Sequence, residues 1–181
     1  KIENESVVGI TNDDVRKKLR GKAGTEVNVS IIRTGITKPI EYTIVRDKIP
    51  LYSVDTHFMI DNTTGYVSVS RFSETTYDEL NQALQDLNKN GMKQLVLDLR
   101  SNPGGYLNQA VKISDLFIDD KKKIVYTEGR RQEFDEQYFA SEPSIFEKIP
   151  IIILINHGSA SASEIVSGAV QDWDRGLIVG E

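Results

Sequence analysis

The 181-residue chain contains no cysteine and only two histidines. The absence of cysteine excludes disulfides, thiolate metal sites and a cysteine nucleophile, whichever compartment the protein occupies. The two histidines, His57 and His157, share neither a helical nor a hairpin spacing, so the sequence offers no histidine pair for a metal. We therefore expect neither a metal site nor another cofactor.

An excess of positive charge and long apolar runs are also lacking. With 22 lysines and arginines against 27 acidic residues, the formal net charge is −5, and a nucleic-acid partner is disfavoured because phosphates would not be neutralised. No apolar stretch approaches the roughly 20 residues that a membrane-spanning helix needs. The chain opens on "KIENESVVG" without an initiator methionine or a secretory signal, and we interpret it as a piece of a longer protein.

Residues 1–48 have the pattern of one small unit. A helix is predicted in "TNDDVRKKLRG", where Thr11 is the N-cap and Asp14 follows three residues later. Alternating apolar residues then predict a half-buried hairpin of two strands, Thr25–Arg33 and Ile40–Arg46. Because this unit is too small for a good core of its own, we expect it to expose apolar side chains and strand edges.

Residues 49–181, which begin within the boundary segment "DKIPLYSVD", alternate between strands and helices. Strands are predicted at 64–72, 94–100, 123–129, 151–156 and 176–181, and helices at 75–91, 106–117 and 161–172. The charged segment 130–148 is expected to be irregular. Alternation of this kind predicts an α/β layer architecture with much parallel strand pairing.

The turn "SNPGG", Ser101–Gly105, stands between a predicted buried strand and a predicted helix. Its two glycines allow unusual backbone angles and leave amide hydrogens uncovered, and such amides can bind an anion or stabilise an oxyanion. A tight strand–helix turn with a proline near the helix start is the commoner explanation of a lone PGG. The turn is not a phosphate-binding loop, because no Lys-Ser/Thr follows it.

A second turn, "SASASE", follows the apolar run at 151–156. Ser161 and Glu164 form an S-x-x-E capping box, which is enough to explain one serine as a helix cap. Capping does not explain the whole run of small residues, which indicates that another group, either a substrate or a second helix, approaches the backbone here. A nucleophilic Ser161 would have the N–H of Ala162 beside it for the developing negative charge.

A serine nucleophile also needs a base, and neither histidine is well placed to be one. His157 precedes Ser161 by four residues across a turn, where the local geometry makes it a weak candidate. His57 is expected to be structural. Neither histidine has an obvious aspartate to orient it, although Asp172 and Asp174 lie one helix away. A Ser-His-Asp triad is therefore poorly supported.

Paired carboxylates are the other common catalytic arrangement. Asp98 in "LVLDLR" lies on the same predicted strand face as Arg100, two residues along, and we expect the two side chains to pair. No second acid has a spacing that indicates glycosidase chemistry.

Taken together, the two turns resemble those of the C-terminal processing peptidase family, the tail-specific proteases. The motifs are "LVLDLRSNPGGYLNQAVKISDLFI" and, some fifty residues later, "IIILINHGSASASEIVSGAVQDWDRGLIVGE". Residues 1–48 resemble the second half of that family's PDZ domain. The resemblance covers nearly the entire chain and implies a Clp protease/crotonase-like core of ββα units at 49–181, preceded by a partial PDZ domain.

The resemblance also implies catalytic roles for particular residues. The family's nucleophile corresponds to Ser161, and its oxyanion hole to the backbone N–H groups of Gly105 and Ala162. The family's base is a lysine in an F-G-K-G segment just past the strand ending in V-G-E, whereas this sequence ends at Glu181. Lys112 does not match that setting, so the general base is expected to be absent from these residues.

The implied function is that of a serine endopeptidase with a Ser/Lys dyad and no cofactor. Its substrates would be proteins or peptides, recognised through their C-terminal segments, in the periplasm or elsewhere in the cell envelope. The 181-residue chain itself is expected to be inactive without the lysine. The alternative is a non-catalytic scaffold on the same fold that binds peptides or other ligands. A CoA-binding crotonase-like enzyme is disfavoured, because the serine-bearing turn has no role there.

Overall fold

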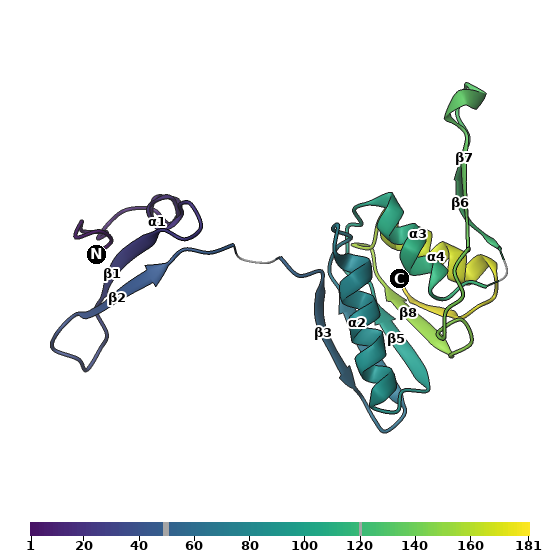
Figure 1. The fold of residues 1–181 in the computed structure, drawn as a ribbon, viewed down its shortest axis with the longest axis horizontal. Helices are drawn as coiled ribbons and strands as arrows, with labels where there is room; N and C mark the ends of the chain where they lie inside the picture. Colours follow the sequence, from purple (N-terminus) through teal and green to yellow (C-terminus); the bar gives the residue numbers. More distant parts are fainter. Residues whose placement is uncertain (49–50, 120) are drawn as a thin grey trace. The chain divides into compact units, whose positions relative to one another are not determined.

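A computed structural model describes residues 1–48, 51–119 and 121–181 of the chain (Figure 1). The chain divides into two compact units, Lys1–Leu51 and Tyr52–Glu181. The boundary predicted between residues 48 and 49 falls beside residues 49 and 50, which lie outside the described residues. Each unit is described by itself below.

The N-terminal unit contains one helix and one hairpin. Helix α1 spans Asn12–Leu19, and strands β1 (Glu26–Ile31) and β2 (Ile40–Val45) pair antiparallel. The predicted cap of α1 is present, because the Thr11 hydroxyl accepts a hydrogen bond from the Asp14 N–H at 3.2 Å. These local signals therefore predicted both elements correctly.

Little apolar surface is buried within this unit. Of its described apolar residues, Ile2 and Val27 are buried, whereas Ile32 is 85% exposed and Val45 59% exposed. Each strand of the hairpin has a single strand neighbour among the described residues. The expected exposure of apolar side chains is confirmed. The expected open strand edge is wrong for β1, because residues 1–3 pair with it: the Ser30 N–H donates to the Lys1 carbonyl and the Glu3 N–H to the Asn28 carbonyl, each at 2.9 Å.

The C-terminal unit is built on a five-stranded sheet in the order β3-β4-β5-β8-β9. The strands are β3 (Val54–Met59), β4 (Thr64–Val69), β5 (Gln94–Asp98), β8 (Ile151–Ile155) and β9 (Leu177–Gly180). Strand β3 is antiparallel to β4, and the other neighbouring pairs are parallel. The predicted α/β architecture with parallel pairing is confirmed.

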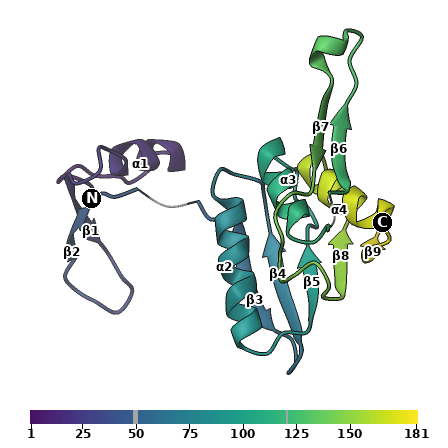
Figure 2. The same ribbon diagram turned by 45° about the vertical axis from the view of Figure 1, so that its right-hand side comes forward.

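Three helices connect these strands and share one core with the sheet (Figures 1 and 2). They are α2 (Thr76–Lys89), α3 (Leu107–Asp115) and α4 (Ala162–Asp172). Alternate strand residues such as Leu97 and Ile153 are completely buried, together with helix residues such as Leu84 and Val166. Within the described ranges, no helix combines the length and apolarity that crossing a bilayer requires.

Two strands were not predicted. Strand β3 carries His57 and adds an antiparallel edge to the sheet where only a domain junction was expected. Strand β7 (Glu136–Phe139) pairs with β6 (Lys123–Thr127) inside the segment that was expected to be irregular. The β6–β7 hairpin extends away from the rest of the C-terminal unit (Figures 1 and 2). Both missed strands are largely exposed on both faces, so their sequences lack the alternation that marks a half-buried strand.

Candidate active site

The two turns singled out in the sequence lie side by side in the structure. Strands β5 and β8 are parallel neighbours, with Leu97 opposite Ile153, so the turns that follow them emerge at the same edge of the sheet. The carboxyl ends of parallel strands are the usual place for a ligand site. The turns are in direct contact, because the Ala160 N–H donates to the Asn102 carbonyl at 3.0 Å.

Ser161 is exposed at the N-cap of α4 with an unusual backbone conformation, φ 54° and ψ −114°. The predicted capping box with Glu164 is present, and the Glu164 carboxylate accepts from the Ser161 N–H at 2.7 Å. An ordinary N-cap has extended angles, as at Thr11 with φ −73° and ψ 158°. Positive φ in a non-glycine residue costs on the order of 1–3 kcal/mol and is typical of functional sites. Capping therefore explains the Ser161–Glu164 pairing but not this strain.

The two glycines of the "SNPGG" turn allow a close approach that no side chain would permit. At Gly104, with φ 93°, an added Cβ would lie 2.6 Å from the Ala160 carbonyl oxygen and 2.8 Å from the Ala162 nitrogen. At Gly105, with φ 148°, it would lie 2.1 Å from the Phe72 carbonyl oxygen. The turn is thus held between the segment that follows β4 and the backbone around Ser161.

Two backbone N–H groups remain available at this junction. The residues on either side of Gly105 bind Phe72: the Phe72 N–H donates to the Gly104 carbonyl, and the Tyr106 N–H donates to the Phe72 carbonyl, each at 2.9 Å. The N–H of Gly105 therefore points away from Phe72. Ala162 begins α4, so its N–H has no acceptor within the helix. In the part of the chain that the structure describes, neither N–H has a protein acceptor. Gly105 is exposed, whereas Ala162 is buried against the glycine turn. Amides without a protein acceptor beside an exposed serine are the groups that can stabilise an oxyanion.

Asn102 holds the two turns together, and sequence reasoning missed it. Its side chain is fully buried, donates to the Val69 carbonyl at 2.8 Å and accepts from the Gly104 N–H at 2.9 Å. Its backbone carbonyl accepts from the Ala160 N–H and from the Ser163 hydroxyl, both at 3.0 Å. One residue thus connects the end of β4, the glycine turn and the start of α4.

Replacing Asn102 by alanine is expected to lower the free energy of unfolding by about 2–4 kcal/mol, because two buried groups lose their partners. Urea unfolding of the purified chain measures the loss. The matched control is Asn88→Ala on an exposed position of α2, which should change stability by less than about 0.5 kcal/mol. Equal effects of the two substitutions would show that Asn102 does not hold the turns.

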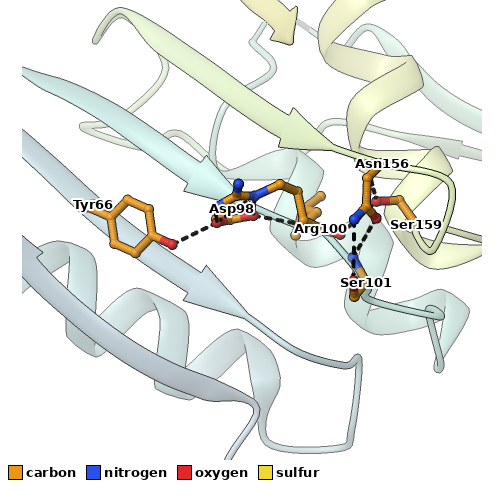
Figure 3. A network of polar contacts seen from close by, with 7 residues as sticks. Tyr66, Asp98, Arg100, Ser101, Asn156 and Ser159 are labelled. Atoms are coloured by element: carbon orange, nitrogen blue, oxygen red, sulfur yellow. Dashed lines mark hydrogen bonds and ion pairs between the residues drawn. The ribbon is translucent and has the colours of Figure 1, made fainter. Parts of the chain in front are cut away.

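A second polar network anchors β5 just before the glycine turn (Figure 3). The buried Asp98 carboxylate accepts from the Tyr66 hydroxyl at 2.6 Å and from the Arg100 guanidinium at 2.6 Å, so the predicted pairing with Arg100 is confirmed. Burial acts to raise the pKa of Asp98, but the hydrogen bonds from Arg100 and Tyr66 outweigh it and hold this pKa below its ordinary value. Asp98 is therefore a poor proton acceptor with a structural role.

Asn156, at the end of β8, joins the same edge of the sheet (Figure 3). Its side-chain oxygen accepts from the N–H of Ser101 at 2.7 Å and from that of Gly158 at 3.0 Å. The Ser159 hydroxyl donates to the Leu99 carbonyl at 2.7 Å. Since the hydroxyls of Ser159 and Ser163 bind the backbone between the turns, two of the three serines in "SASAS" are structural, and only Ser161 is exposed.

Among the described residues, none of the candidate bases in the sequence forms a hydrogen bond with Ser161. His57 lies on β3, and His157 is exposed. Lys112 lies over the Tyr77 ring, 5.6 Å from its centroid, on the groove between α2 and α3. Within the described ranges, no histidine, lysine or carboxylate side chain forms a hydrogen bond with the Ser161 hydroxyl.

The chain is thus an α/β protein with a mainly parallel sheet, in which the exposed Ser161 follows the interior strand β8. Residues 63–181, most of the chain, match Peptidase family S41, and the chain belongs to this family. The resemblance to C-terminal processing peptidases is thereby confirmed.

Curated relatives of this chain are named carboxy-terminal processing proteases. The chain is 40% identical over 184 residues to the carboxy-terminal-processing protease of Bartonella bacilliformis, covering 99% of this chain and 42% of that protein. It is 36% identical to the carboxy-terminal processing protease CtpA of Bacillus subtilis, covering 100% of this chain and 38% of that protein. The chain thus spans about two-fifths of the length of these relatives.

Solved structures show the same fold. The photosystem II D1 C-terminal processing protease matches with a TM-score of 0.64 and 29% identity, over 100% of this chain and 50% of that one. The tricorn protease matches with a TM-score of 0.51 and 19% identity, over 98% of this chain and 17% of that one, and shares the fold alone.

Proposed function

We propose that these residues belong to a serine endopeptidase of the C-terminal processing type, with Ser161 as its nucleophile. The observation that supports this most is the strained, exposed Ser161 beside the glycine turn, where the N–H groups of Gly105 and Ala162 have no acceptor among the described residues. In the proposed reaction, the Ser161 Oγ attacks the carbonyl carbon of a peptide bond. The oxyanion that forms accepts hydrogen bonds from both N–H groups.

The proposed base is a neutral lysine located beyond Glu181, as the family resemblance implies. It takes the proton of Ser161 and passes it to the leaving amine, and water then hydrolyses the acyl-enzyme by the reverse sequence of transfers. Burial lowers the pKa of a lysine and so permits this role at neutral pH. Because the relatives are more than twice as long as this chain, they have room for such a segment.

We also propose that residues 1–48 are the second half of a PDZ domain that binds the C-terminal segment of a protein substrate. The hairpin and α1 of this unit, and the match of the relatives across it, support the assignment. PDZ domains bind an extended peptide by adding it to a sheet edge. By the same resemblance, the protein would act in the cell envelope or periplasm.

The function is tested by comparing the 181-residue chain with the full-length protein that contains it. The short chain should show negligible cleavage of unfolded protein and fluorogenic peptides, and the full-length protein should cleave both. Ser161-dependent cleavage by the short chain would instead assign the base to His157 or to one of its own lysines. Inactivity of the full-length protein, with peptide binding retained, would support the non-catalytic scaffold.

A further inference from the structure

A shallow, open groove of about 480 Å³ runs from Ser161 along the C-terminal unit, between α4 and β6. Residues 124–126 of β6 form one wall, and α4 forms the other with Ile165 and Gly168, as far as Asp172 at its last turn. Whatever occupies this groove is therefore in direct reach of the candidate nucleophile.

One face of α4 is turned toward this groove. Ser161, Ile165, Gly168 and Asp172 are spaced by four, three and four residues, the spacing of one helix face. The opposite face, which carries Val166 and Val170, is completely buried in the core. The groove face is thus the less buried side of α4, although Ile165 packs partly against the core.

In the part of the chain that the structure describes, nothing requires glycine at position 168 on this face. It lies inside a helix, its φ is not positive, and an added Cβ would meet no atom within 4 Å. At Gly104 and Gly105 the same Cβ would collide with backbone. Glycine destabilises a helix interior relative to alanine. Position 168 therefore carries a residue that is unfavourable for the helix, beside space that an alanine methyl group could occupy. Room for a ligand accounts for that choice.

The lining of the groove indicates what kind of ligand it holds. Its floor is apolar, with Ile165 half-buried and Ala169 buried, and Val125 contributes from β6. Two exposed carboxylates also line it, that of Glu164 next to Ser161 and that of Asp172 at the far end. Strand β6 has a single strand neighbour among the described residues, and such a strand can accompany an extended chain.

We propose that this groove binds the stretch of an extended peptide substrate adjacent to its scissile bond, and that Gly168 limits the size of the side chain accepted there. An apolar residue lies over Gly168, and a neutral or basic residue lies near Asp172. This inference rests on the proposed peptidase function and names the specificity-determining part of the same site.

The first test introduces Gly168→Ala and Gly168→Leu into the full-length protein. Fluorogenic peptides with a single leucine or alanine moved through each position are the probes. For the best leucine peptide, Gly168→Ala should lower kcat/KM about 10-fold and Gly168→Leu about 100-fold, because one or more methylene groups then compete for the space. Peptides with alanine at that position should be affected less. Gly168→Ala should at the same time raise the melting temperature by about 1–4 °C, because alanine favours the helix.

A matched control separates helix stability from the groove. Asn88→Ala improves helix propensity on an exposed position of α2 and should leave kcat/KM unchanged for every peptide. A stabilised Gly168→Ala protein with unaltered kcat/KM for all peptides would overturn the proposal. Ser161→Ala is measured in parallel: if that variant still cleaves, the peptidase function itself fails, whatever Gly168 does.

Asp172→Lys provides an independent second test at the far end of the groove. The probes are peptides in which one glutamate or one lysine is moved along the sequence. At a single peptide position, the native protein and the variant should prefer opposite charges, by about 10-fold in kcat/KM. The native protein should prefer lysine there, and the variant should prefer glutamate. Identical scans for the two proteins would show that no substrate passes Asp172.

Discussion

Replacing Ser161 by alanine in the full-length protein is expected to lower kcat for peptide cleavage by about 10⁶-fold, since losing the nucleophile of a base–nucleophile unit removes covalent catalysis altogether. The oxyanion-binding amides would remain and would leave only a small residual rate. The fold should survive, because the Ser161 side chain is exposed and the Glu164 carboxylate binds the backbone N–H of residue 161 rather than its hydroxyl. Steady-state cleavage of a fluorogenic peptide measures the loss.

Thr11→Ala is the matched control, because it removes a side-chain cap in the other unit. This substitution should cost about 1 kcal/mol of stability without affecting cleavage of short peptides. If Ser161→Ala behaved in the same way, losing a little stability and no activity, Ser161 would be a helix cap only. The proposed mechanism would then be wrong.

Replacing Gly105 by alanine should have the next largest effect, lowering kcat by about 10²–10³-fold through displacement of one oxyanion donor. The new Cβ would lie 2.1 Å from the Phe72 carbonyl oxygen, so the backbone must move and the Gly105 N–H with it. Binding of uncleaved peptide should change little, because this amide acts on the charge that develops in the transition state. Separate measurement of kcat and of peptide affinity in the Ser161→Ala background distinguishes the two effects.

Gly24→Ala controls for strain alone. Gly24 also has positive φ, at +84°, but an added Cβ there would meet nothing within 4 Å. Its substitution should cost about 1–2 kcal/mol, the penalty for an L-residue in the left-handed region, with cleavage of short peptides unchanged. A folded Gly105→Ala protein with native kcat would exclude the Gly105 amide as an oxyanion donor.

The two turns could be identified from the sequence because their signals are local. Glycines after a buried strand, a serine with a glutamate three residues later, and apolar runs of strand length all lie within a few residues of one another. The same reasoning correctly predicted the parallel sheet, the cap at Thr11 and the pairing of Asp98 with Arg100. It failed for β3 and β7, because strands exposed on both faces have no apolar alternation to detect.

The sequence by itself determined the alternating α/β layers, the family motifs and the exposed serine that begins α4, since these depend on neighbouring residues and on patterns along one segment. Only the tertiary structure decided which distant groups meet. Asn102 contacts Val69 across 33 residues and Ser163 across 61, and these contacts exist because parallel pairing of β5 with β8 places both turns at one edge. The groove beside Gly168 likewise forms only where β6 passes α4. Separation along the chain hides such contacts from any local pattern, whereas packing of the sheet and helices creates them.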